Sequence, residues 1–297
     1  MRCFRVSILI LSLATVVMAV VAGCVNNTSS SKIVTVTLPP QKYLVEQIAG
    51  DNVEVRCLLS NGANPETYDP TVTNMMNLDK SIAYLRIGNV GFEEAVLEKI
   101  ALANPSLPIY DISDGIELIT GTHTHTHAHA GETVEHVTPD PHTWTSVKNA
   151  RVMASNILQA LKEIDPANTV EYNANYERLV NRLDSLDADF SARLATAGHP
   201  AFIVWHPSLS YLARDYGLTQ IIAGGAENKE SSVAAVREAI DKATESEAKV
   251  FFYQKDIDTR HLAALNSSIN ATEVDINPLS GDWETEMIKI VDALTAK

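Results

Sequence analysis

Apolar residues follow two repeating periods along the chain, the twofold period of strands and the three-to-four-residue period of helices. Short runs rich in Val and Ile predict strands at Ile33–Leu38, Val53–Leu59, Ile82–Ile87, Pro108–Ile112, Ala201–Trp205, Leu218–Ala223, Val250–Gln254 and Ala271–Ile276. The segments between them predict helices at Gln41–Gly50, Thr71–Lys80, Phe92–Leu102, Ser146–Ile164, Ser208–Tyr216, Ser231–Ser246, Thr259–Asn266 and Trp283–Ala296. Strands that alternate with helices indicate an α/β fold with mostly parallel sheets.

One segment in the middle of the chain is longer than the others. From Pro166 to Ala197 no glycine and no further proline interrupts the sequence, and apolar residues recur at helical spacing. One helix over this segment would be roughly 48 Å long at ~1.5 Å per residue; two helices broken near Asp187 are the alternative. We therefore expect two lobes, each a mostly parallel sheet flanked by helices, joined by one long helix. Their bounds are 33–165, 166–198 for the linking helix, and 199–297.

The first residues have the composition of an export signal. Arg2 and Arg5 precede an apolar run, Val6–Ala22, which Gly23 and Cys24 follow. Cysteine after small residues resembles the bacterial lipobox, which implies removal of residues 1–23 and acylation of Cys24. An uncleaved anchor is the alternative, although the run is shorter than the ~20 residues that span a bilayer. We expect a tether over 24–32 and a lipoprotein anchored to the membrane, in the periplasm or at the cell surface.

Charge and motifs exclude several kinds of function. The chain has 23 basic and 37 acidic residues, a net charge of −14, which does not favour contacts with nucleic-acid phosphates. The sequence contains no P-loop, no His-Glu-x-x-His motif and no Gly-x-Ser-x-Gly elbow, so it gives no sign of an enzyme. An acidic chain of this kind is compatible with binding a cation.

Histidines gather between the fourth predicted strand and the next helix. A tract of alternating residues carries His123, His125, His127 and His129, and His136 follows shortly after. Such composition is typical of metal binding, and we expect a loop over 121–137 that binds auxiliary metal. A solvated loop without a role is the alternative.

Three other side chains occur in turns near predicted strand ends. Glu66, His142 and His206 have this position, and Asp275 ends the last strand, with Asn277 two residues later. Ligands in open α/β sheets bind at the carboxyl ends of strands. Imidazoles and carboxylates together suit a divalent first-row ion, although each residue alone has the composition of an ordinary turn.

Several segments together resemble a known family, the metal-binding solute-receptor lipoproteins of bacterial zinc and manganese ABC importers. The segments are Gly62–Pro70, Asp140–Trp144, Val204–His206 with Tyr211, Tyr216–Leu218, Asn228–Ser232 and Asn277–Leu279. The resemblance implies a monomer without enzymatic activity, a metal held between two lobes, and delivery of that metal to a membrane permease. It also implies that His142 and His206 are ligands.

The chain departs from the family at two ligand positions. Glu66 stands where the family usually has His, and Asn277 stands at the late Asp, two residues after Asp275. We expect Glu66, His142, His206 and Asp275 to bind the ion, with Asn277 as the alternative fourth ligand. The carboxylate favours manganese or iron, whereas His206 and the histidine-rich segment favour zinc, so we predict Zn²⁺ with Mn²⁺ as the alternative.

Two other functions use the same residues. A metallohydrolase would need a general base, for which Asp140 and Glu227 are the candidates. A surface adhesin is the other alternative, since the resembling family includes lipoproteins described as adhesins.

Overall fold

The first lobe is built on a parallel sheet. In a computed structural model that describes residues 32–60, 62–129, 132–198, 200–224, 233–255 and 259–296, the order of its strands is β2-β1-β3-β4. The strands are β1 (Ile33–Val36), β2 (Glu54–Cys57), β3 (Ala83–Arg86) and β4 (Ile109–Asp111). Helices α2 (Pro39–Ala49), α3 (Val72–Leu78) and α4 (Gly91–Ala103) connect them. Each pairing is parallel, because a helical segment returns the chain before every next strand.

The second lobe repeats this plan with its own parallel sheet, in the order β10-β9-β7-β8. Its strands are β7 (Ala201–Val204), β8 (Thr219–Ile222), β9 (Val250–Tyr253) and β10 (Thr272–Asp275). Helices α7 (Ser210–Tyr216), α8 (Val233–Glu245) and α9 (Thr259–Ile269) accompany them. The central strand β7 is apolar throughout and buried at every position, as expected of a strand covered on both faces. The prediction of two α/β lobes is confirmed.

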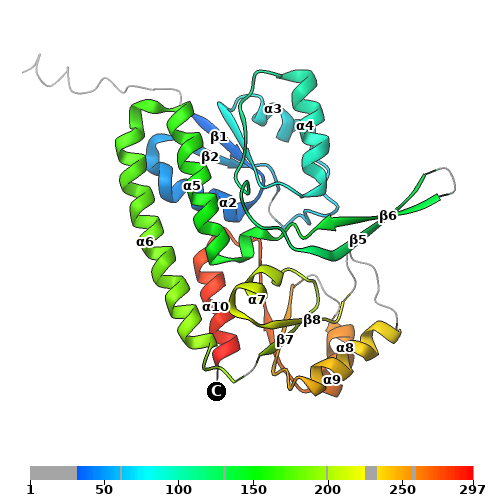
Figure 1. The fold of residues 1–297 in the computed structure, drawn as a ribbon. Helices are drawn as coiled ribbons and strands as arrows, with labels where there is room; N and C mark the ends of the chain where they lie inside the picture. The colour runs from blue at the N-terminus through cyan, green and yellow to red at the C-terminus, as the bar shows by residue number, and fades with distance from the viewer. Residues whose placement is uncertain are drawn as a thin grey trace, which may run out of the picture. The chain divides into compact units, whose positions relative to one another are not determined.

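One long helix, α6 (Thr169–Leu194), follows a single 3-10 turn at Pro166–Asn168. It has 26 residues and continues through Asp187, so the prediction of one helix rather than two is confirmed. Its length is about 39 Å at ~1.5 Å per residue. Its buried stripe includes Leu183 and Phe190. The helix lies beside α5 (Val147–Ile164), as the two neighbouring green helices in Figure 1 show.

The last described helix, α10 (Trp283–Thr295), returns to the first lobe. The rings of Tyr43 in α2 and Trp283 lie 5.9 Å apart between centroids, and the Tyr43 hydroxyl donates to Glu284 at 2.8 Å. Arg182 of α6 also donates to Glu284, at 2.7 Å. One hydrophobic cluster therefore contains residues of α2, α5, α6 and α10 together with residues of both sheets.

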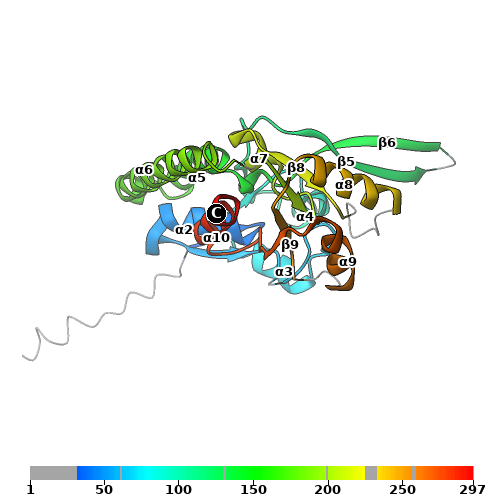
Figure 2. The same cartoon turned by 90° about the horizontal axis from the view of Figure 1, so that it is seen from below.

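The histidine-rich segment forms a hairpin rather than the loop expected from its composition. Strands β5 (Thr120–His129) and β6 (Glu132–Pro139) pair antiparallel, with His125 opposite His136 in the register. The hairpin extends away from the two parallel sheets in both views (Figures 1 and 2). Alternation of histidine with small residues has the twofold period of a strand, and this period explains the difference.

Some of the predicted features lie outside the described residues. These are the export signal, Cys24 and most of the tether, together with Glu227 and the segment Asn228–Ser232. Within the part that the structure describes, none of the helices is both long and apolar enough to cross a membrane.

Candidate metal centre

Three side chains from distant parts of the chain meet at one point. Glu66, His142 and His206 each offer one donor atom, and these atoms all lie within 4.8 Å of one another. The Nε2 atoms of the two histidines are 3.1 Å apart, and His206 Nε2 lies 3.4 Å from Glu66 Oε1. Ligands about 2.0–2.2 Å from a tetrahedral ion are separated by roughly 3.3–3.6 Å. Both separations are close to those between ligands of a tetrahedral ion.

Glu66 is positioned by a turn between β2 and α3. Its backbone N–H donates to Asn64 Oδ1 at 2.9 Å, an Asx turn that fixes the direction of the chain. Tyr68 ties the same loop to the end of the strand, because its hydroxyl donates to the carbonyl of Leu58 at 3.0 Å. The Tyr68 ring also packs edge-on against Phe92 of α4 at 5.2 Å. Local hydrogen bonds and one aromatic contact thus set the place of this carboxylate.

His142 lies shortly after β6, which ends at Pro139, and directly before the 3-10 turn Thr143–Thr145; it is 4% exposed. Its backbone N–H donates to Asp140 Oδ1 at 2.9 Å, and its Nδ1 lies 2.7 Å from the same oxygen. Thr145 returns two hydrogen bonds to the His142 carbonyl, from its N–H at 3.0 Å and its hydroxyl at 2.9 Å. His142 is therefore held by hydrogen bonds both at its backbone and at its imidazole ring.

Two tryptophans attach the His142 turn to the second lobe. Trp144 Nε1 donates to the Pro278 carbonyl at 2.9 Å, and Trp283 Nε1 donates to the Trp144 carbonyl at 2.7 Å. Both indole N–H groups are buried and both have acceptors, as buried indoles require. The turn that carries His142 is thereby fixed to Pro278, between β10 and α10, and to Trp283 at the start of α10.

His206 comes from the second sheet, two residues after the end of β7. The preceding residue, Trp205, donates from its backbone N–H to Phe252 in β9 at 3.0 Å, and its carbonyl accepts from Gly224 at 3.0 Å. A parallel neighbour on each side therefore fixes the carboxyl end of β7. The His206 ring packs edge-on against that of His142 at 5.0 Å between centroids.

The structure does not bring the expected fourth ligand to this group. Asp275 ends β10 as predicted, but its carboxylate lies 3.7 Å from Lys255 Nζ and 3.9 Å from Lys289 Nζ. It is not among the residues whose donor atoms converge. The Asn277 side chain accepts from the Leu279 N–H at 3.2 Å, a turn contact, and Asn277 is exposed.

The predicted auxiliary histidines are placed only by their backbone. His123, His125, His127 and His129 alternate along β5, and His136 lies on β6. The hairpin that carries these histidines ends at Pro139, directly before Asp140, so the His142 turn follows it in the sequence. Asp140 itself, a candidate general base from the sequence, contacts the ring of His142.

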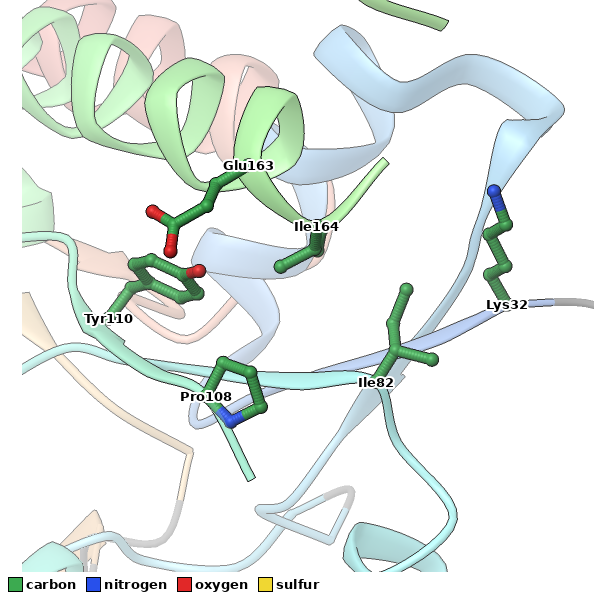
Figure 3. Close-up of a pocket in the computed structure, with 6 residues that line it drawn as sticks. All are labelled: Lys32, Ile82, Pro108, Tyr110, Glu163 and Ile164. Atoms are coloured by element: carbon green, nitrogen blue, oxygen red, sulfur yellow. The ribbon is translucent and has the colours of Figure 1, made fainter. Parts of the chain in front are cut away.

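A separate pocket of about 290 Å³ lies at the amino ends of strands β1, β3 and β4. Figure 3 shows the residues that line it: Lys32, Ile82, Pro108, Tyr110, Glu163 and Ile164. Ile82 and Pro108 directly precede β3 and β4, whereas Glu66 follows the end of β2. Burial, reinforced by a hydrogen bond to Glu163, raises the pKa of Tyr110 to about 12. The pocket contains none of the three converging side chains.

The chain is similar to known proteins over nearly all of its described length. The family model for ZnuA, the periplasmic component A of a zinc-uptake complex, matches residues 34–296. The high-affinity zinc uptake system protein ZnuA of Bacillus subtilis (strain 168) is 26% identical over 282 residues, which cover 91% of this chain and 88% of that protein.

Solved structures have the same fold. A crystal structure of ZnuA superposes with a TM-score of 0.78 at 30% identity and covers 89% of this chain and 98% of that one. The structure of FpvC from Pseudomonas aeruginosa in complex with Mn²⁺ has a TM-score of 0.73 at 24% identity and covers 89% and 97%. At that identity the second likeness concerns the fold alone.

Proposed function

Because the chain belongs to the family of the periplasmic component A of zinc-uptake complexes, we propose that it binds Zn²⁺ through Glu66, His142 and His206. It then passes the ion to the membrane permease of an ABC importer. The observation that carries this proposal is the convergence of three donor atoms within 4.8 Å, from turns after β2, β6 and β7. Two imidazoles and a carboxylate are ligands that zinc accepts.

The choice of zinc rests on the balance of the donor set. Two imidazole nitrogens suit zinc, and one carboxylate makes the set harder, which favours manganese or iron as the alternative. The zinc relative from Bacillus subtilis and the Mn²⁺ complex of FpvC illustrate both options among similar proteins. Elemental analysis of protein purified without added metal, followed by competition between Zn²⁺ and Mn²⁺, distinguishes them. Retention of zinc against excess manganese is expected; preferential retention of manganese would contradict the zinc assignment.

The ligand set is tested by removing one donor at a time. Glu66→Ala, His142→Ala and His206→Ala are each expected to weaken Zn²⁺ binding roughly 100-fold, since a zinc site worth ~10–16 kcal/mol gains about 3 kcal/mol per ligand. Isothermal titration against a competing chelator measures the change. Asp275→Asn is the matched control, because that carboxylate faces two lysines, and its affinity should stay at the wild-type value. Unchanged affinity in Glu66→Ala would remove Glu66 from the site.

A metallohydrolase fits these residues less well. Three protein ligands leave a position that a hydrolase could use for water. The carboxylate closest to the histidines, Asp140, already accepts from the backbone and ring of His142, so it is not placed to act as a general base. Absence of hydrolytic turnover in zinc-loaded protein is the expected result.

The hairpin and the anchor complete the proposal. The histidines of β5 and β6 raise the local metal concentration beside the His142 turn, and acylated Cys24 holds the receptor at the membrane. Deletion of residues 122–129 should slow metal uptake under a chelator while site affinity stays nearly constant. Cys24→Ser should release the protein from the membrane fraction. Equal uptake, or a variant that stays membrane-bound, would contradict the respective role.

A further inference from the structure

We propose that Asp140 is a positioning residue that holds His142 in one tautomer and directs its Nε2 towards the metal. This inference rests on the proposed function, because it concerns how one of the three ligands is prepared for the ion. The Asp140 carboxylate would then have a role in metal binding in addition to its place in the turn.

The hydrogen bonds determine which ring nitrogen carries the proton. Asp140 Oδ1 accepts from the His142 N–H at 2.9 Å and lies 2.7 Å from His142 Nδ1. A carboxylate has no proton to donate, so Nδ1 is the donor in this contact. In the neutral imidazole the lone pair is then on Nε2, the atom that lies 3.1 Å from His206 Nε2.

Asp140 is itself held on several sides. Its residue is 0% exposed, and it lies between Pro139 and Pro141, which restrict the backbone. Its N–H donates to the Ile119 carbonyl at 2.8 Å, and its carbonyl accepts from the Tyr211 hydroxyl at 2.7 Å. These contacts hold the backbone of Asp140 in place. Its buried carboxylate therefore extends from a fixed backbone position to the backbone N–H and the ring of His142.

Tyr211 connects Asp140 to the second lobe. It lies in the first turn of α7, is fully buried, and accepts from the Ile119 N–H at 3.3 Å while it donates to Asp140. Burial raises the pKa of Tyr211 to about 12, so the hydroxyl keeps the proton that it donates. Because α7 follows the His206 turn by only a few residues, the same lobe supports both imidazoles.

The expected energetic effect follows from metal sites of this kind. A carboxylate that accepts from the second nitrogen of a ligating histidine raises the basicity of the first, and its loss typically weakens metal binding 10- to 100-fold. Asp140→Asn keeps the size of the side chain and one acceptor oxygen but removes the charge. We expect a loss of about 10- to 100-fold in Zn²⁺ affinity in Asp140→Asn, and a larger loss in Asp140→Ala.

The tautomer supplies a readout that a purely structural residue would not change. In the metal-free full chain at about pH 8, where an ordinary histidine is neutral, two-bond ¹H–¹⁵N spectra should show His142 as the Nδ1–H form in the wild type. Asp140→Ala should shift it towards the Nε2–H form or a mixture. A wild-type His142 in the Nε2–H form would overturn the inference without any variant.

Affinity measurements separate this inference from the proposed function. If His142→Ala loses zinc and Asp140→Asn binds as tightly as the Asp275→Asn control, the positioning role fails and the site stands. If His142→Ala keeps wild-type affinity, the proposed function fails. Weaker binding in Asp140→Asn, at a free energy of unfolding close to that of the wild type, supports the inference.

Discussion

Gly224 leaves no room for a side chain beside the residue that precedes His206. A Cβ at this position would lie 2.5 Å from the Trp205 carbonyl oxygen and 2.8 Å from its ring. A methyl group must therefore displace the backbone at the end of β7. Gly224→Ala is expected to cost about 1–3 kcal/mol in free energy of unfolding, as overpacking does, and to weaken Zn²⁺ binding by moving His206.

Urea unfolding and zinc titration of Gly224→Ala check both effects. Gly281→Ala is the control, since a Cβ there meets nothing within 4 Å. Equal affinity in the two variants would mean that the close approach at Gly224 does not set the position of His206.

Glu93 predicts a pH dependence of stability in the first lobe. It is 1% exposed and accepts from the N–H groups of Ile87 and Gly88, both at 2.8 Å, and from the hydroxyls of Thr37 and Tyr84. Burial raises its pKa above the ordinary value of 4.5, and the hydrogen bonds offset only part of this effect. The folded state then binds this proton more tightly than the unfolded chain.

The direction of the pH dependence follows from the difference in proton binding between the folded and unfolded chain. The contribution of Glu93 to stability is fully present below pH 4.5 and is lost as the pH rises through its raised folded pKa. Relative to Glu93→Gln, the wild type should lose free energy of unfolding as the pH increases through this window. Urea titrations of both proteins between about pH 4 and pH 7 measure the difference; a difference that is constant with pH would contradict the raised pKa.

The sequence alone was enough to predict the three side chains that converge. It was not enough to predict the contacts of the carboxylates near them. Glu66, His142 and His206 were recognisable because each follows a strand or turn and matches a family segment. Asp275 has the same position in sequence, yet the direction of its side chain depends on the lysines of neighbouring elements. The contact of Asp140 with His142 could not be derived from a Pro-Asp-Pro sequence, which is equally typical of a plain turn.

Helix α10, near the end of the chain, contacts α2, near the start of the first lobe. Glu284, 8% exposed, accepts from Tyr43 of α2 and from Arg182 of α6, and thereby links three helices. Glu284→Ala leaves the partly buried Tyr43 hydroxyl without its acceptor. We expect a loss of about 1–3 kcal/mol in free energy of unfolding, measured by urea denaturation.

The exposed Glu177 on α6 offers the matched control for this substitution. Glu177→Ala should change stability by less than about 0.5 kcal/mol. An effect of Glu284→Ala no larger than that of the control would show that hydrophobic packing alone attaches α10.

Helical and strand periods predicted nearly all of the described elements, including the unbroken α6. These periods do not show which other element the apolar face of a helix packs against. The buried face of α10 is evident from its spacing, but its packing against α2 is a long-range choice that no local pattern contains. The hairpin was missed for another reason: its alternating positions are histidine, threonine and alanine, so the twofold period lacked an apolar face that would mark it as a strand.

For the whole molecule, metal binding and stability should be coupled. A ligand that binds only the folded chain stabilises it by about 2.7 kcal/mol at a free concentration 100 times its Kd. Zn²⁺ should therefore raise the melting temperature by several degrees relative to protein treated with a chelator. His142→Ala should abolish the shift, and a shift that persists in this variant would place the stabilising ion elsewhere.

The return of α10 to the first lobe also has a consequence for the order in which the chain folds. Tyr43 and Glu284, which meet in the finished structure, are separated by 241 positions. The contact between α2 and α10 can therefore form only after nearly the whole chain has been synthesised.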